Sequence, residues 1–186
     1  MTLEDISAHL KKSSLSNRPI TIAIEGFGGA GKSTFAANLK RELRDAYVID
    51  LDDFFLKEKI SDAIKSNFDR KRLEKQVLLP LGNGHTAAYQ KLEYATNTLS
   101  KFIKVPSVKY LLIEGVSSFH PDIAHYMDYK IWIDTPREVA DARGRKRDKE
   151  LGDDNGTLWD NWTKTYQDYK DMYDLEAAAD FIFDNH

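Results

Sequence analysis

Cysteine is absent from this sequence of 186 residues, which excludes disulfide bonds, cysteine-ligated metals and a thiol nucleophile. Apolar runs of membrane-spanning length are also missing, and residues 1–12 lack the continuous apolar core of a signal peptide. The net charge of −3 gives no excess of positive charge of the kind that marks a general nucleic-acid-binding protein. These absences predict a cytoplasmic protein that needs neither a membrane nor a nucleic acid as partner.

What is present fits a single globular domain over residues 1–186. Hydrophobic residues make up 41% of the chain and charged residues 31%, as in ordinary folded proteins. Apolar, β-branched segments alternate with helix-like segments, which favours a mostly parallel sheet with helices on both faces. The expected strands are 20–25, 47–51, 109–114, 129–134 and 180–184, and the expected helices are 3–12, 34–43, one starting at 135–136, and about 158–179.

The stretch between the second and third expected strands, residues 57–106, is too long for a simple crossover. We expect a helical insertion there, over the carboxyl edge of the sheet, where α/β proteins bind their ligands. Its second half, 85–106, has only weak periodicity.

The most informative motif is GFGGAGKS at residues 26–33, which matches the P-loop pattern G-x-x-x-x-G-K-[ST]. It follows an expected strand and precedes an expected helix, as the motif requires. Its backbone N–H groups and the helix dipole would hold phosphates, Lys32 would reach the β- and γ-phosphates, and the Ser33 hydroxyl would bind Mg²⁺. The expected nucleotide-binding residues are Gly26, Gly28, Gly29, Ala30, Gly31, Lys32, Ser33 and Thr34.

Acidic residues follow two of the expected strands. Asp52 and Asp53 come just after 47–51, on the same sheet edge as the P-loop, and one of them could align an attacking hydroxyl. The alternative is an aspartate that caps a helix or turn. Glu114 ends an apolar run and precedes Gly115, as a Walker-B-type carboxylate does, although an exposed acid at a strand end would look the same. We expect Ser33, Glu114 and Asp52 to surround Mg²⁺.

Positive charge for the transferred phosphoryl group is expected from Arg143 and Arg147. Their i, i+4 spacing places them on one helix face, in a basic segment that leads into a turn-rich loop. Residues 143–157 therefore suit a lid that closes over the phosphates. A solvated charged face is the alternative, because acidic residues lie nearby.

Weaker candidates for the acceptor side are Asp69, His85, Tyr89, Glu93 and Tyr94. Asp69 could bind substrate hydroxyls or cap a surface helix. The aromatic residues Trp159, Trp162, Tyr166, Tyr169 and Tyr173 follow a 3-4-3-4 spacing, which indicates a packing stripe on a helix.

Taken in order, the segments IEGFGGAGKST, VIDLDDFF, NFDRKRLEKQVLLPL, LLIEGV and IWIDTP, with a following R-x-x-x-R-D, resemble the uridine kinase group of P-loop kinases. This group is related to phosphoribulokinase and bacterial pantothenate kinase. The likeness covers about residues 20–184. It implies a three-layer P-loop NTPase fold of the nucleoside-kinase type, with five parallel strands, a helical insertion and a lid.

The resemblance also assigns roles to particular positions. Asp52 matches the family's catalytic aspartate, Asp69 an aspartate that contacts ribose hydroxyls, and Glu114 the glutamate associated with Mg²⁺. Arg143 and Arg147 match the lid arginines. The substrate-binding residues that we expect are Asp52, Phe55, Asp69 and Tyr89.

Two departures from the family pattern fall on the acceptor side. Phe55 stands where a tyrosine is usual, and the proline–tyrosine–aspartate element that frames the nucleobase is not recognisable. Its nearest counterpart is 89–94 (YQKLEY), with Glu93 where an aspartate is expected. The motifs for phosphate binding are intact, so phosphoryl transfer is better supported than uridine as acceptor.

The sequence thus predicts an ATP- and Mg²⁺-dependent kinase of a small molecule that carries a hydroxyl group, such as uridine. A sugar or a pantothenate-like alcohol is an alternative acceptor, and a non-catalytic ATP-binding regulator is an alternative function. A GTPase switch is disfavoured because the guanine-reading N-K-x-D motif is missing. Homo-oligomer formation stays open.

Overall fold

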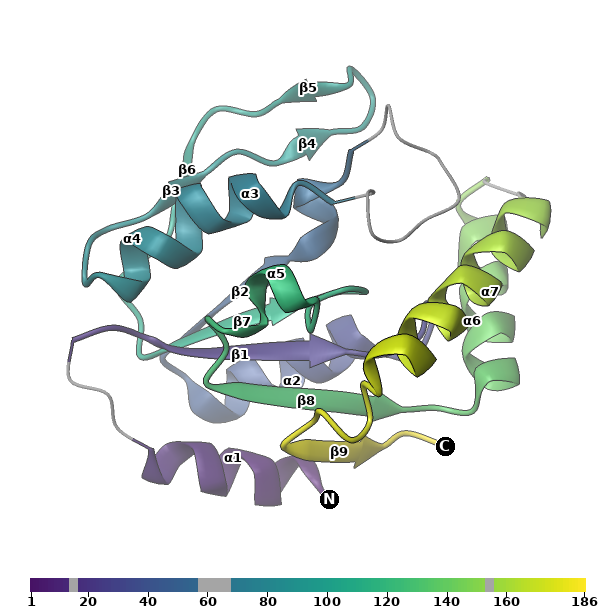
Figure 1. Ribbon diagram of the computed structural model, residues 1–186, viewed down its shortest axis with the longest axis horizontal. Helices are drawn as coiled ribbons and strands as arrows, with labels where there is room; N and C mark the ends of the chain where they lie inside the picture. Colours follow the sequence, from purple (N-terminus) through teal and green to yellow (C-terminus); the bar gives the residue numbers. More distant parts are fainter. Residues whose placement is uncertain (14–16, 57–67, 153–155) are drawn as a thin grey trace.

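Five parallel strands form the centre of the molecule, in the order β2-β7-β1-β8-β9 (Figure 1). The computed structural model describes residues 1–13, 17–56, 68–152 and 156–186. The strands are β1 (Ile20–Glu25), β2 (Ala46–Asp50), β7 (Tyr110–Glu114), β8 (Tyr129–Asp134) and β9 (Phe181–Asp184). The predicted fold class, a five-stranded sheet in a three-layer P-loop architecture, is confirmed.

The central strands are mostly apolar because helices cover both faces of the sheet. All six residues of β1 and all five of β7 are buried. In the parallel register Ile24 pairs with Glu114, and Glu114 pairs with Asp50. The carboxyl ends of β1, β7 and β2 therefore come level, which brings the segments that follow them to one edge.

Two clusters of buried side chains stabilise the layers. One joins the sheet to α1 (Leu3–Lys12), α2 (Lys32–Leu43) and α7 (Gly156–Tyr173). The other joins it to α5 (Pro121–Ala124) and to the segments between β2 and β7. The helices α6 (Arg137–Glu150) and α7 lie side by side beyond the carboxyl ends of the strands (Figure 1).

The insertion is helical only in part, which corrects the prediction for 57–106. A short helix α3 (Arg70–Leu73), a π-helical turn η4 (Glu74–Leu78) and α4 (Leu79–Gly82) follow one another. Two antiparallel pairs come next: β3 (Ala88–Tyr89) with β6 (Ile103–Lys104), and β4 (Leu92–Glu93) with β5 (Thr98–Leu99). Residues 57–67 lie outside the described part.

Side-chain hydrogen bonds explain why the second half of the insertion has so little periodicity. The Gln90 backbone N–H donates to Gln76 Oε1 at 2.9 Å, and Gln90 Nε2 donates to the Ser100 carbonyl at 2.9 Å. Strands of two residues have no pattern of alternation long enough to read from sequence.

The last helix is also shorter than predicted. Instead of 158–179, α7 spans Gly156–Tyr173, and turns follow it as far as 178. Asp174 has φ 45°, a left-handed conformation that cannot continue a right-handed helix.

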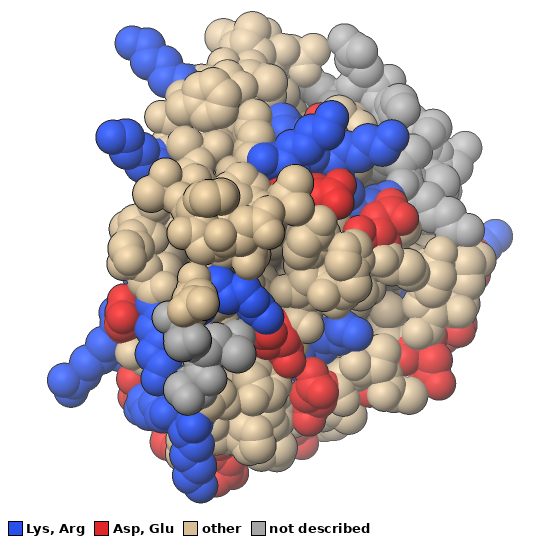
Figure 2. Space-filling view, turned by 60° about the vertical axis from the view of Figure 1, so that its left-hand side comes forward, with Lys and Arg blue, Asp and Glu red and all other residues tan. Residues whose placement is uncertain are grey.

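Charges of both signs are interspersed on the face shown in Figure 2. Within the described ranges, none of the helices is both long and apolar enough to span a membrane.

Candidate active site

The P-loop connects β1 to α2 at the carboxyl edge of the sheet. Gly31, with φ 92°, is the N-cap of α2. Because glycine has no side chain, no cap side chain occupies the backbone N–H groups of the first turn. The amino end of α2 therefore presents backbone N–H groups and the positive end of its dipole. This is the geometry that an anionic phosphate requires.

Lys32 is buried beneath the loop that precedes it. Its Nζ donates to the carbonyl oxygens of Gly26 at 3.0 Å and Phe27 at 2.9 Å. Burial lowers the pKa of Lys32, while the negative charges of Glu114, Glu25 and Asp52 oppose this effect. The ammonium group is thus held inside the P-loop with acidic groups on several sides.

Asp52 lies in η1, a 3-10 helix (Leu51–Phe54) that directly follows β2. Asp50 caps this turn, and its Oδ1 accepts from the Asp52 backbone N–H at 2.9 Å. The Asp52 side chain keeps an exposed surface. Loss of hydration, followed by repulsion from Asp50, nevertheless raises the pKa of Asp52 to about 6. Attraction to Lys32 and Arg147 opposes the rise, so Asp52 lies within the field of both cations.

Glu114 is buried at the end of β7, opposite Asp50 in the register. Burial and then the Asp50 charge raise the pKa of Glu114 to about 7, whereas Lys32 and a hydrogen bond with Ser33 lower it. The Ser33 hydroxyl bonds to Glu114, and the charge of Asp52 acts on the same carboxyl group, so these residues offer oxygen ligands in a region of negative charge. That donor set fits Mg²⁺, which binds proteins through one or two carboxylates and completes its shell with water and phosphate.

The two predicted arginines have different surroundings. Arg147 contributes positive charge at Asp52 and forms an ion pair with Asp148 at 2.8 Å. Arg143 Nη1 instead approaches the carbonyl oxygen of Asn185 at 3.4 Å. Both side chains are exposed on α6. Residues 153–155 of the predicted lid lie outside the described ranges.

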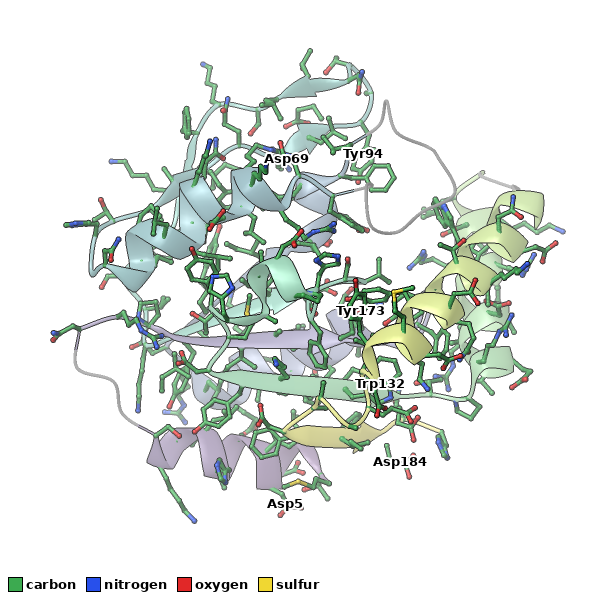
Figure 3. The ribbon with its side chains drawn as sticks, in the orientation of Figure 1. Asp5, Asp69, Tyr94, Trp132, Tyr173 and Asp184 are labelled. Carbon is green, nitrogen blue, oxygen red and sulfur yellow. The ribbon has the colours of Figure 1, made fainter. Side chains whose placement is uncertain are left out.

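Aromatic residues of the insertion hold the turn that carries the two aspartates. Tyr94 donates its hydroxyl to the Asp52 carbonyl at 2.9 Å, and Tyr89 donates to Asp53 Oδ2 at 3.3 Å. The Phe55 ring lies 6.3 Å from that of Tyr94. Phe55, Tyr89 and Tyr94 therefore gather near Asp52, on the side of the insertion where Tyr94 is labelled in Figure 3.

Asp69 has a structural partner in the same region (Figure 3). It is the N-cap of α3, because its Oδ1 accepts from the Arg72 backbone N–H at 3.0 Å, and its Oδ2 lies 3.4 Å from Arg72 Nε. Helix capping, one of the two roles that the sequence allowed, is therefore observed for Asp69. A role in substrate binding stays a prediction.

Three residues near the site were not predicted from the sequence. Asp50 caps η1 and repels both Asp52 and Glu114, and Glu25 is a buried acid at the end of β1. Arg72 stacks over Phe54 at 4.8 Å and donates to the carbonyl groups of Gln90 and Asp53. Glu25 and Asp50 could have been found by the signal that identified Glu114, because each is an acidic residue at the end of an apolar strand. Arg72 gave no such signal in its charged segment.

Comparison with known proteins finds uridine kinases and a uridine kinase-like protein among the similar sequences. The chain is 30% identical to uridine kinase-like protein 4 of Arabidopsis thaliana, over 92% of this chain and 40% of that protein. It is 29% identical to a uridine kinase of Clostridium perfringens, over 70% of this chain and 69% of that protein. No protein-family model matches the chain.

Two solved structures share the fold. A protein of Bacillus stearothermophilus described as a possible uridine kinase superposes with a TM-score of 0.72 at 18% identity, over 98% of this chain and 97% of that one. A protein of Silicibacter sp. TM1040, provisionally named as a fructose transport system kinase, superposes with a TM-score of 0.76 at 20% identity. The superposition covers 98% of this chain and 99% of that one. The likeness to uridine kinase and related P-loop kinases that the motifs predict is confirmed.

Proposed function

We propose that this protein is an ATP-dependent kinase that transfers the γ-phosphoryl group to a hydroxyl of a small molecule, with a nucleoside such as uridine as the leading acceptor. The observation that carries the proposal is the meeting of Lys32, Asp52 and the Ser33–Glu114 pair at the carboxyl ends of β1, β2 and β7. The uridine kinases among the relatives support the acceptor class.

In this proposal the P-loop amides and Lys32 bind the β- and γ-phosphates of ATP. Ser33, Glu114 and Asp52 would hold Mg²⁺, which neutralises charge on the phosphates when bound. Asp52 orients the acceptor hydroxyl and takes its proton as the oxygen attacks the γ-phosphorus, while the bond from that phosphorus to the bridging oxygen breaks and ADP leaves. Arg147, whose charge already acts on Asp52, adds positive charge beside the transferred group, and Arg143 would join it if α6 moves closer.

The test is an ADP-release assay with Mg·ATP across nucleosides, sugars and pantothenate-like alcohols. We expect turnover with uridine or another pyrimidine nucleoside, and none in the Asp52→Asn variant. Turnover with only a sugar or a pantothenate-like alcohol would support the kinase activity but replace uridine as the proposed acceptor. Tight binding of ATP without turnover of any acceptor would overturn the proposal in favour of an ATP-binding regulator.

A further inference from the structure

Glu25 is a fully buried acid at the point where β1 becomes the P-loop. Its Oε1 accepts from the Ser117 backbone N–H at 2.6 Å and from the Tyr166 hydroxyl at 2.8 Å. Its Oε2 accepts from the Phe119 backbone N–H at 2.7 Å and lies 3.4 Å from the Ser118 hydroxyl. One carboxylate thus joins the end of β1, the segment after β7, and α7.

Tyr166 belongs to a face of α7 that packs toward the nucleotide-binding loop. Its ring meets that of Phe27, within the P-loop, edge to face at 5.1 Å. One turn earlier, the Thr163 hydroxyl donates to Asp141 Oδ1 of α6 at 2.6 Å. Residues at intervals of three and four share one face of a helix, so these contacts fix the rotation of α7 about its axis.

Trp159 lies on the same face and covers the P-loop. Its indole N–H donates to Asp148 Oδ2 of α6 at 2.8 Å, and the side chain is 6% exposed. A Cβ on Gly28 would lie 3.1 Å from the indole ring, and a Cβ on Gly144 would collide with it. Both glycines therefore leave the space that the indole fills between the P-loop and α6.

We propose that the hydrogen bond between Glu25 and Tyr166 holds α7 against the P-loop, and we call this bond the latch. Glu25 and Tyr166 are then positioning residues for phosphoryl transfer. The latch holds Trp159 against Gly28 and, through α6, places Arg147 near Asp52. The consequence for turnover depends on the proposed kinase function, whereas the latch itself does not.

The direct test measures how easily acrylamide quenches Trp159 fluorescence. A Trp162→Phe background removes the tryptophan that is 39% exposed, and Trp132, at 1% exposed, is a shielded baseline. Tyr166→Phe removes the hydroxyl and keeps the ring. We expect the quenching constant to rise about threefold because α7 opens locally from the P-loop.

Tyr169→Phe is the matched control. It makes the same chemical change one turn further along α7, where the buried Tyr169 hydroxyl forms no hydrogen bond of normal geometry among the described residues and interacts only weakly with Ser117. We expect its quenching constant to equal that of the background protein. Equal quenching in the Tyr166→Phe and Tyr169→Phe variants would overturn the latch.

Kinetics then separate positioning from general destabilisation. With the acceptor found by the ADP-release assay, Tyr166→Phe should lower kcat about tenfold while the Kd for Mg·ATP changes less than about threefold. A lower melting temperature with unchanged quenching and unchanged kcat would assign the bond a purely structural role and overturn the proposal. If no acceptor is found, the kinase proposal fails, and quenching still decides the latch.

Should Tyr166→Phe fail to fold, Glu25→Gln decides the question. Glutamine keeps the shape of the side chain but offers one acceptor oxygen where the carboxylate offers two. We expect an increase in Trp159 quenching of about twofold because the bonding around position 25 weakens. No increase in that variant would overturn the latch.

Discussion

The two sides of the candidate active site are built in different ways. On the phosphate side, the backbone makes the site: Gly31 caps α2, and Lys32 donates to two carbonyl groups of its own loop. On the acceptor side, long side chains make it, since Tyr89, Tyr94 and Arg72 reach the turn of Asp52 and Asp53 from the insertion.

This difference accounts for the contrast in the sequence motifs, which fit the family pattern on the phosphate side and depart from it on the acceptor side. Backbone geometry of this kind depends on glycines at fixed spacing, which a local motif records. Contacts between distant side chains allow many combinations of residues, so the acceptor side can change its ligand while the phosphate side stays the same. The departures at Phe55 and Glu93 fall where such change is expected.

The largest effect should come from Lys32→Ala on the phosphate side. The variant removes the buried ammonium group from the P-loop, so both Mg·ATP affinity and turnover should fall, with kcat/KM lower by about 10³-fold. Isothermal titration calorimetry and steady-state kinetics measure the two losses. Wild-type affinity for ATP in this variant would contradict the role assigned to Lys32.

Asp52→Asn tests the point where the two sides meet. Asparagine keeps the size of the side chain but cannot take a proton, so kcat should fall by at least about 10²-fold while ATP affinity stays nearly intact. Asp53→Asn is the matched control, because Asp53 accepts from Tyr89 and the cations that act on it are Lys91 and Arg72. A larger loss in the control than in Asp52→Asn would exchange the roles of the two aspartates.

The pH dependence of kcat/KM should report Asp52. Its pKa is raised to about 6, so the ionised form that acts as base predominates above that pH and is lost as the pH falls through it. We expect kcat/KM to decrease at least about tenfold per pH unit on the acid side, because Glu114, with its pKa raised to about 7, loses its charge over the same range. The acid limb should persist in Asp53→Asn. A profile that stays flat from pH 7 to 5 would exclude Asp52 as the titrating base.

The smallest effect should come from Tyr94→Phe on the acceptor side. It removes the hydrogen bond to the Asp52 carbonyl and keeps the ring beside Phe55. The loss of one hydrogen bond should raise the KM for the acceptor about three- to tenfold and leave ATP affinity unchanged. An equal change in ATP affinity would show that the two sides are less independent than their contacts indicate.

Much of the fold could be predicted from the sequence, because the patterns that indicate its strands and its P-loop lie in short, continuous segments. The apolar segments that became β1, β7 and β8 were each assigned within a residue of their ends, and the P-loop was placed between a strand and a helix. The predicted end of α7 was wrong because the positive φ of Asp174 ends the helix, although the side-chain pattern of a helix continues beyond it. The short strands of the insertion were missed because side-chain contacts, rather than periodicity, support them.

By itself, the sequence determined the phosphate-binding loop, the parallel sheet and the candidate residues at the strand ends, since each follows from spacing along the chain. Only the tertiary structure decided that Arg147 rather than Arg143 lies in the field of Asp52, that Asp50 sets the charge around it, and that Glu25 joins α7 to the P-loop. Glu25 and Tyr166 are 141 positions apart. Their proximity depends on the packing of the whole domain, which no local pattern in the sequence records.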